Sequence, residues 1–539
     1  MTSIMKTELV KEHLIEIFSK DEIAQIDFSK VNPKKDILSS IFESLSKNRE
    51  QYAQFYTHKE IVEFILDNLP INDKSKILDP ACGAGAFLIE VISRYNIKPE
   101  NIFGIDIDPL AISLCKLNSE LTKDIKLVNL FNKNSLENIY ASGNLERESF
   151  DFIIGNPPFK NITKEEYDSK DNLFKEVISG SVNSATLMIA RSFELLKNNG
   201  YLAFVLPKNL LRVESFNKLR MFILSNFKIN LIIDLDHHFK DVRCDQIVLI
   251  LQKEKLEINR NRNIVKIIPY KKGIDFREAK PYFMDQSDFF KYSFFPLFYN
   301  ENVKRLADKF LKIDIKLGSK NQIFRGISIG SKHKSIKKEK TPESITCFRG
   351  DSIKRFGIKY PLFLDTSILV NSETKKLDRL KTSKIIIQNL CSKEGGIFGA
   401  LSENNEASLD TVTNIIPLDK SHLKFYLGLL NSKISNFFMT FVIYLNSNFT
   451  MHTDKVYIGE IPIKTPDSIQ LLSINKLVDK LLSNDDKYSP EFFEIYNELN
   501  GKLYELYDLN TQEILIIEDS LKEVMSKKQN GRKDEQFIG

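Results

Sequence analysis

The sequence predicts an α/β protein: a mostly parallel sheet with helices on both faces, followed by a mixed α+β domain and terminal helices. Three observations support this fold class. Short apolar runs alternate with amphipathic helical patterns from Ser75 to about Lys253, and this alternation is typical of parallel sheets. The polar stretch KEKLEINRNRN at 253–263 ends the alternation, and irregular runs rich in Lys, Ser and Asn follow. A chain of 539 residues is also too long for one compact core.

Six short apolar runs are the strand candidates of the alternating region. Helical patterns separate them, such as SATLMIARSFELLKNNG, which ends on Gly200, a good helix C-cap. The candidate strands are KILD at 76–79, IFGIDID at 102–108, FDFIIGN at 150–156, YLAFVLP at 201–207, NLIIDL at 230–235 and QIVLILQK at 246–253.

Shifts in composition divide the chain into four parts. We expect a helical segment at 1–50, the α/β domain at 51–255, a mixed domain at 256–465, and helices with a polar tail at 466–539. The last fourteen residues, SKKQNGRKDEQFIG, have the composition of a disordered tail.

Composition excludes several protein classes. Apolar residues make up 42% and charged residues 28%, as in ordinary soluble proteins. The longest apolar region, 425–445, is interrupted by Asn431, Lys433 and Asn436 and is a poor membrane span. The N-terminus lacks the apolar run of a signal peptide. The five cysteines are widely spaced without a CxxC pair, which argues against a zinc site and a disulfide framework. We therefore expect a cytoplasmic protein without a membrane partner.

A turn with two glycines follows the first candidate strand, in KILDPACGAGAFLIEVI. Asp79 ends the strand, and Gly83 and Gly85 let the backbone approach a ligand closely. About twenty residues later Asp106 ends the next strand, where an acid suits the hydroxyl groups of a ribose. Leu88 stands in place of the third glycine of the dinucleotide fingerprint. Because both acids end strands on one rim of the sheet, the pattern favours a cofactor site over a simple tight turn.

The third candidate strand runs directly into Asn156-Pro157-Pro158-Phe159. The two prolines fix the backbone and remove two donors, so the local carbonyl groups are held rigidly. The Asn156 amide oxygen and the Pro157 carbonyl can then accept both hydrogens of one exocyclic amino group, which frees its lone pair to attack a methyl group. Positioning and electrostatics carry such a reaction without a strong base. Phe159 would stack on the ring that bears the amine. Alone, the tetrapeptide is equally a proline turn; beside the glycine turn, the catalytic interpretation is favoured.

In this order the motifs resemble those of the S-adenosylmethionine-dependent DNA amino-methyltransferases, specifically the γ arrangement of adenine-N6 enzymes. QFYTHKEIVEFIL at 54–66 matches the family's leading Q-F-Y-T-P element, with His58 in place of the proline. The resemblance covers 50–255 and continues more loosely through CFRGDSIKRFG, KTSKIIIQNL and LGLLNSKISNFF. It implies a Rossmann-like class I methyltransferase domain, S-adenosyl-L-methionine as cofactor, and a C-terminal target-recognition domain at 256–465. The implied substrate is a flipped-out adenine in double-stranded DNA.

The resemblance also assigns roles to residues. Tyr56 and Thr57 are expected to close over the methionine part of the cofactor, and NKNSL at 132–136 stands where the family contacts the cofactor adenine, with Asn134 replacing the usual Asp. The expected catalytic residues are Asn156, Pro157, Pro158 and Phe159. The expected cofactor-binding residues are Tyr56, Thr57, Asp79, Ala81, Cys82, Gly83, Gly85, Asp106, Ile107, Asn134 and Ser135.

DNA contacts are expected in two regions. DHHFKDVRCDQIVLILQK at 236–253 resembles the family's hairpin whose aromatic residue stacks on the flipped base; this makes Phe239 a second stacking candidate, although a core position suits it equally well. His237 and His238 are expected to face solvent or DNA, and the chemistry needs no metal. Two basic clusters supply the candidate phosphate contacts Lys332, Lys334, Arg349 and Arg355, although each cluster is equally typical of a solvated face.

Several alternatives stay open. The amine of cytosine N4 satisfies the same geometry. The chain could be a modification subunit that needs a separate specificity subunit, although the roughly 200 residues beyond the sheet suit a built-in recognition domain. A protein-glutamine methyltransferase ranks lower because those enzymes are generally shorter, and an inactive DNA-binding protein ranks lower because the motif at 156–159 is intact. A separately encoded restriction endonuclease is neither required nor excluded as a partner.

Overall fold

The computed structural model forms two compact units, divided between Leu297 and Phe298. The expected N-terminal helical segment and the polar tail lie outside the described residues. The structure describes residues 57–123, 125–137, 139, 145–236, 245–270, 274–292, 294–298, 300–329, 333–369, 371–447 and 450–525.

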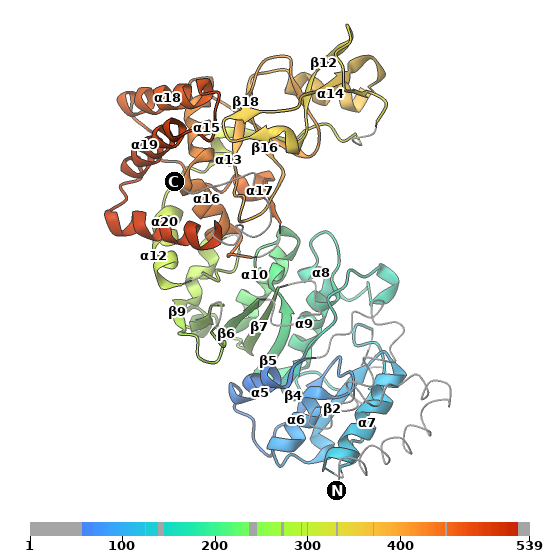
Figure 1. Cartoon of the computed structure of the whole chain (residues 1–539). Coiled ribbons are helices and arrows are strands. Elements are labelled where there is room, and N and C mark those ends of the chain that lie inside the picture. The colour runs from blue at the N-terminus through green and yellow to red at the C-terminus, as the bar shows by residue number, and fades with distance from the viewer. Residues whose placement is uncertain are drawn as a thin grey trace, which may run out of the picture. The chain divides into compact units, whose positions relative to one another are not determined.

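A nine-stranded sheet forms the centre of the first unit, in the order β3-β2-β1-β4-β5-β7-β6-β8-β9 (Figure 1). The first five strands pair in parallel, and β7 runs antiparallel between β5 and β6. The strands are β1 (Ile77–Asp79), β2 (Ile102–Asp106), β3 (Asn129–Asn132), β4 (Phe150–Gly155), β5 (Leu196–Pro207), β6 (Phe227–Asp236), β7 (Gln246–Lys253), β8 (Ile264–Ile268) and β9 (Tyr282–Asp285).

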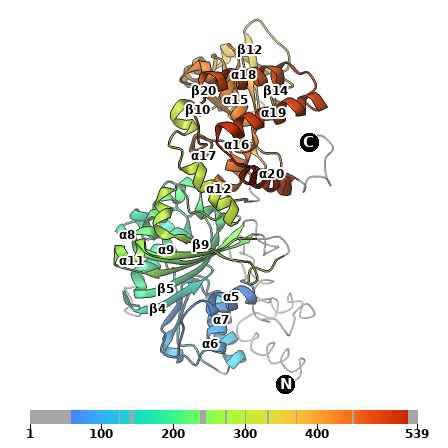
Figure 2. The same cartoon turned by 90° about the vertical axis from the view of Figure 1, so that its left-hand side faces the viewer.

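The predicted α/β fold is confirmed. All six predicted strands are present, and β2 and β7 are buried at nearly every position, as strands covered on both faces are. The helices pack in two groups, α5 with α6 and α7 (Figure 2), and α8 with α9 and α10 (Figure 1). The helices of this unit are α5 (Lys59–Asp67), α6 (Ala86–Arg94), α7 (Pro109–Lys123), α8 (Asn172–Val177), α9 (Ser184–Leu195), α10 (Asn217–Asn226) and α11 (Glu257–Asn261).

The sheet extends beyond residue 255, where the sequence places a domain boundary. β8 follows the polar stretch and pairs in parallel with β6, and β9 pairs antiparallel with β8. The polar stretch is therefore a connection on the surface of the first unit, with α11 inside it, and the division between the compact units comes some forty residues later in the chain, at Leu297.

The second unit contains two four-stranded sheets, ordered β10-β20-β16-β18 and β11-β15-β12-β19, and a small hairpin of β13 and β14. These strands are β10 (Asn321–Arg325), β11 (Ile336–Lys337), β12 (Ser344–Phe348), β13 (Ile353–Lys354), β14 (Gly357–Ile358), β15 (Leu362–Asp365), β16 (Lys384–Gln388), β18 (Gly399–Ser402), β19 (Ala407–Ser408) and β20 (Val412–Pro417). Its longer helices are α12 (Glu301–Leu311), α14 (Asn371–Leu380), α15 (Leu423–Asn431), α18 (Ser468–Ser483), α19 (Pro490–Leu506) and α20 (Thr511–Met525).

The long apolar region at 425–445 is buried core of the second unit. It comprises most of α15, then α16 (Lys433–Phe437) and a π-helical turn (Phe438–Ile443) whose six residues are all buried. Over the part of the chain that the structure describes, no helix combines the length and apolar character needed to cross a membrane.

Candidate functional site

The carboxyl ends of β1, β2 and β4 meet at one rim of the sheet, because these strands are parallel neighbours. Asp79 is the last residue of β1, Asp106 is the last of β2, and Asn156 directly follows β4. Open α/β sheets bind ligands at this rim. The fold therefore brings the two acids and the amide, which are far apart in the sequence, to one side of the molecule.

The glycine turn between β1 and α6 has left-handed backbone at Gly83 (φ 52°) and Gly85 (φ 91°). A Cβ atom at Gly85 would lie 2.6 Å from Cys115 Sγ, so this glycine lets the turn close against α7. A Cβ atom at Gly83 would meet nothing within 4 Å. The backbone at Gly83 thus faces open space, as a ligand-binding turn requires.

Asp106 accepts hydrogen bonds from two backbone amides at the rim. Its Oδ2 lies 2.8 Å from Gly83 N and its Oδ1 lies 2.9 Å from Asp108 N. Burial raises the pKa of this carboxyl group to about 6. The next side chain, Ile107, is 52% exposed, which is unusual for an isoleucine at the end of a buried strand. An acid beside an exposed apolar side chain fits the ribose and the base of a nucleoside.

Asp79 joins the glycine turn to the Asn156–Phe159 motif. Its Oδ1 accepts the Ala81 amide at 3.1 Å, and a Cβ atom placed on Gly155 would lie 2.6 Å from the same oxygen. The carboxylate therefore lies against the last residue of β4, immediately before Asn156. Burial, and to a lesser degree the nearby Asp106, raises the pKa of Asp79 to about 8.

These raised pKa values predict a pH dependence of stability. Asp79 and Asp106 ionise near pH 3.8 in an unfolded chain but at about 8 and about 6 in the folded protein. Between these values the folded state binds more protons than the unfolded state, so the free energy of unfolding falls as pH rises. We expect the melting temperature of the ligand-free protein to decline from about pH 5 to about pH 8, and Asp79→Asn to make the decline shallower. Equal slopes for the two proteins in a calorimetric pH series would contradict this.

Ser184, the first residue of α9, anchors the Asn156–Phe159 loop. Its Oγ donates to the Pro158 carbonyl at 2.5 Å and accepts the Lys160 amide at 3.2 Å. Its own amide donates to the Lys160 carbonyl at 3.0 Å. Sequence reasoning missed this residue, because a serine that opens a helix is usually explained by capping alone.

Replacing Ser184 by alanine should lower the turnover of the protein's reaction about tenfold, since the loop then loses two hydrogen bonds. Ser192→Ala is the matched control: Ser192 is buried in the same helix, and its Oγ donates to the Met188 carbonyl at 2.7 Å. Steady-state kinetics of both variants measures the turnover. If Ser184→Ala turned over as fast as Ser192→Ala, Ser184 would not position the loop.

The segment at 132–136 lies against both acid-bearing strand ends. Ser135 Oγ donates to the Pro80 carbonyl at 2.6 Å, and the Lys133 amide donates to the Asp106 carbonyl at 3.0 Å. Asn134 accepts the Leu136 amide at 3.0 Å. The structure therefore gathers this segment with the glycine turn and Asp106, and Thr57, which precedes α5, is buried in the same unit.

The remaining predicted residues differ in whether the structure describes them and in how exposed they are. Tyr56, His237, His238, Phe239 and Lys332 lie outside the described residues, so their predicted roles stay predictions. Lys334 and Arg349 are exposed, and Arg349 pairs with Asp351 at 2.5 Å. Arg355 is half-buried, and its Nη1 donates to the Asn431 carbonyl at 2.5 Å and the Tyr496 hydroxyl at 2.7 Å. These two hydrogen bonds lie within the second unit.

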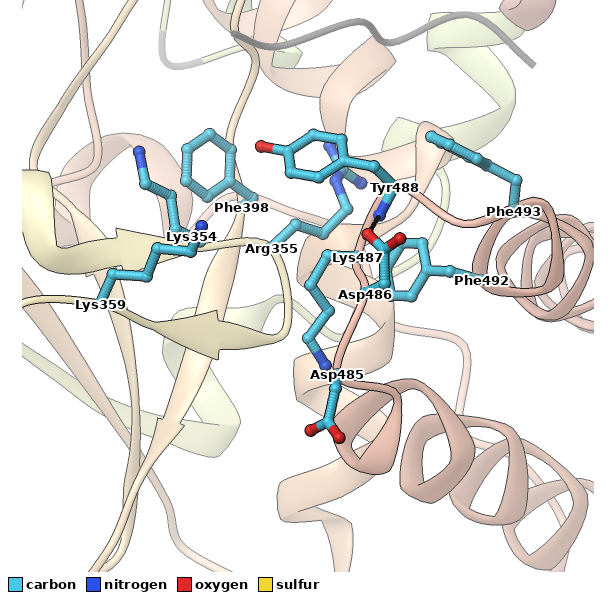
Figure 3. A pocket seen from close by; sticks show the side chains of 10 residues that line it. All are labelled: Lys354, Arg355, Lys359, Phe398, Asp485, Asp486, Lys487, Tyr488, Phe492 and Phe493. Carbon is cyan, nitrogen blue, oxygen red and sulfur yellow. Dashed lines mark hydrogen bonds between the residues drawn. The ribbon is translucent and has the colours of Figure 1, made fainter.

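A cavity of about 130 Å³ lies in the second unit beside the β13–β14 hairpin (Figure 3). Four basic side chains and two acidic ones line it together with aromatic rings, so its lining carries an excess of positive charge. The lining residues are Lys354, Arg355, Lys359, Phe398, Asp485, Asp486, Lys487, Tyr488, Phe492 and Phe493.

Comparison with known proteins identifies relatives for both units. Residues 33–309 match the family described as N-6 DNA Methylase, and residues 345–463 match the TaqI-like C-terminal specificity domain. The chain is 34% identical over 225 residues to the Type II methyltransferase M.VspI of Vibrio sp. (strain 343), covering 40% of this chain and 52% of that protein. It is 26% identical over 247 residues to the Type II restriction enzyme and methyltransferase RM.Eco57I of Escherichia coli, covering 33% and 25%. The chain thus spans about half or less of these relatives.

Solved structures share the fold. The Type IIL restriction-modification enzyme MmeI in complex with DNA superposes with a TM-score of 0.61 at 14% identity, covering 94% of this chain and 83% of that one. The DrdV–DNA complex gives a TM-score of 0.54 at 13% identity, covering 88% and 63%. At these identities the likeness concerns the fold alone.

Proposed function

The chain belongs to the N-6 DNA methylase family, and on that premise we propose that it is a site-specific DNA adenine-N6 methyltransferase. The observation that carries the proposal is the close approach of the Asp79 carboxylate to Gly155. This approach joins the glycine turn to the start of the Asn156–Phe159 motif. A cofactor bound at the turn would therefore lie beside the amino group that receives the methyl group. Relatives named as type I and type II methylases support a role in restriction-modification, and a cytoplasmic location follows for an enzyme that acts on cellular or incoming DNA.

The rim residues fit S-adenosyl-L-methionine, which when bound supplies a methyl group on a sulfonium. The Asp106 carboxylate would accept the ribose hydroxyl groups, and the exposed Ile107 offers an apolar face to the adenine. The Gly83 backbone admits the methionine part, and Asp79 offers carboxyl oxygens as hydrogen-bond acceptors on that side. The remaining proposed cofactor contacts are Tyr56, Thr57, Ala81, Cys82, Gly85, Asn134 and Ser135.

Asn156 and Pro157 would hold the reacting amine. The Asn156 side-chain oxygen and the Pro157 carbonyl accept its two hydrogens, which withdraws the nitrogen lone pair from the base. Pro158 keeps the carbonyl groups in place, and Phe159 would stack on the base. The target must leave the duplex at a cost of a few kcal/mol, which stacking on Phe159 and Phe239 at roughly 1–3 kcal/mol each largely offsets.

The second unit would position the duplex. Its match to a TaqI-like specificity domain supports a built-in recognition domain over dependence on a separate specificity subunit. Lys334 and Arg349 are exposed and stay proposed phosphate contacts. The basic lining of the cavity adds Lys354 and Lys359 to them.

A double substitution, Lys354→Ala with Lys359→Ala, should weaken DNA binding on all sequences alike. Two lost phosphate contacts should lower the slope of log affinity against log salt concentration by about 2. Fluorescence anisotropy across a salt series measures this slope. Lys502→Ala in α19, outside the cavity, should leave it unchanged. An unchanged slope for the double variant would remove the cavity from the DNA interface.

The function itself is tested by labelling. Purified protein is incubated with S-adenosylmethionine carrying an isotope-labelled methyl group and with unmethylated DNA, and the digested nucleosides are identified by mass spectrometry. We expect the label on N6-methyladenine. Label on N4-methylcytosine would overturn the assigned base, and an unlabelled digest would overturn the proposed activity.

A further inference from the structure

Both ends of the Asn134 side-chain amide are used inside the first unit. Its Oδ1 accepts the Leu136 amide at 3.0 Å, a bond that an aspartate could also accept. Its Nδ2 donates to the Glu166 carbonyl oxygen at 2.9 Å and to Glu137 Oε1 at 3.4 Å, and an aspartate has no donor for either bond. An ionised aspartate would instead place one oxygen against another. The asparagine is therefore suited to a contact that the aspartate usual in the family cannot make.

Glu166 connects this contact to the catalytic motif. Its Oε1 lies 2.7 Å from Lys160 Nζ, and its Oε2 accepts the Thr163 amide at 2.8 Å. Lys160 is the residue after Phe159, and its amide is bound to Ser184 Oγ. A short run of contacts thus leads from Asn134 to the proposed base-stacking residue.

A second pair of bonds fixes the same segments. The Asp168 amide donates to the Leu136 carbonyl at 3.0 Å, and Ser135 Oγ donates to Pro80 at 2.6 Å. Residues 134–136 are therefore bound on one side to the glycine turn and on the other to 166–168. Hydrogen bonds therefore connect the cofactor side continuously to the loop proposed to hold the target base. Ordering of the glycine turn by a ligand can be transmitted along them.

We propose that Asn134 is a positioning residue that couples cofactor occupancy to the placement of Phe159. The inference rests on the proposed function. It gives the asparagine a role that the family's usual aspartate cannot fill, because the side chain donates to the segment that follows the Asn156–Phe159 motif. An aspartate at this position would remove the Nδ2 bond to Glu166 and leave the Asp168–Leu136 bond as the remaining described backbone tie between 134–136 and 166–168.

The test compares Asn134→Asp with the wild type by hydrogen–deuterium exchange, with and without S-adenosylhomocysteine, which binds without turnover. In the wild type the ligand should slow exchange in 79–86 and also in 156–168. In Asn134→Asp the protection of 79–86 should remain, and that of 156–168 should be clearly reduced. The aspartate keeps an acceptor oxygen toward the cofactor, so the ligand affinity measured by calorimetry should change less than about threefold. Turnover should fall about tenfold because the hydrogen bonds of Nδ2 are lost.

Asn129→Asp is the matched control, because Asn129 Nδ2 also donates to a glutamate carbonyl, that of Glu100, at 2.9 Å. This variant should keep both the coupled protection and the turnover. Glu166→Gln, which removes the charge facing Lys160 but keeps the carbonyl, should weaken the protection of 156–168 without changing ligand affinity.

The outcomes separate this inference from the proposed function. If Asn134→Asp keeps the full wild-type protection of 156–168, or if the wild type never shows it, the coupling is overturned although the enzyme methylates DNA. If the wild type binds the ligand with coupled protection but methylates no DNA, the proposed function fails and the coupling stands. If the wild type does not bind the ligand, both are overturned.

Discussion

Replacing Asn156 by alanine is expected to lower methyl transfer by about a hundred- to a thousandfold while leaving affinity for S-adenosylhomocysteine within a few fold. The side-chain oxygen is one of two proposed acceptors for the reacting amine, and Asn156 follows β4 at the rim where Asp79 and Asp106 also lie. Removing a preorganised group that acts on the reacting atoms typically costs about a hundred- to a thousandfold in turnover. Single-turnover methylation and ligand calorimetry on the same preparation measure the two quantities separately.

Two further variants make the result specific. Asn156→Asp keeps an acceptor oxygen and should retain part of the turnover. Asn226→Ala, in α10, removes an amide that donates to the Phe222 carbonyl at 2.9 Å and should change neither quantity. Near-normal turnover of Asn156→Ala would sink the amine-holding role, whereas loss of ligand binding in that variant would mean that Asn156 supports the cofactor site.

Replacing Asp106 by alanine should weaken cofactor affinity by about a hundredfold, the effect of removing a charged hydrogen-bonding partner worth up to about 3 kcal/mol. The carboxylate holds the Gly83 amide at 2.8 Å and the Asp108 amide at 2.9 Å, so its loss also loosens the turn that admits the ligand. Calorimetric titration with S-adenosylhomocysteine gives the dissociation constant directly.

Asp106→Asn keeps one acceptor and should fall between the wild type and Asp106→Ala. The control is Asp151→Ala, because Asp151 lies near the opposite, amino end of β4, where its Oδ2 accepts the Lys76 amide at 2.9 Å. It should leave affinity unchanged. If Asp106→Ala bound the ligand as tightly as the wild type, the ribose assignment would be wrong.

Much of the first unit could be predicted because its signals are local. Each buried strand is a short apolar run, and the acids and Asn156 stand at strand ends, where a parallel arrangement brings them together. The left-handed backbone at Gly83 and Gly85 is one that glycine adopts readily, so the two glycines mark the turn in their own stretch of sequence. The positions of the motif residues on one rim therefore needed no long-range information beyond strand order.

Contacts between distant segments could not be predicted. Neither the bond from Asn134 to Glu166 nor that from Ser184 to Pro158 has a signature in its own stretch of sequence. The pairing of β8 with β6 is equally hidden, since a polar stretch before β8 has the composition of a linker. Basic clusters likewise do not reveal that Arg355 is bound to Asn431.

Gly155 helps to distinguish homologous genes that encode an active protein from those that have lost function. Any side chain there begins with a Cβ atom 2.6 Å from the Asp79 carboxylate, which is 1% exposed and held by the Ala81 amide, so it has little room to retreat. A homologous gene could keep all four codons of the Asn156–Phe159 motif and still encode a protein in which this motif and the glycine turn no longer fit together. Surveys of genomes for active copies should therefore score five consecutive codons, beginning one position before the motif.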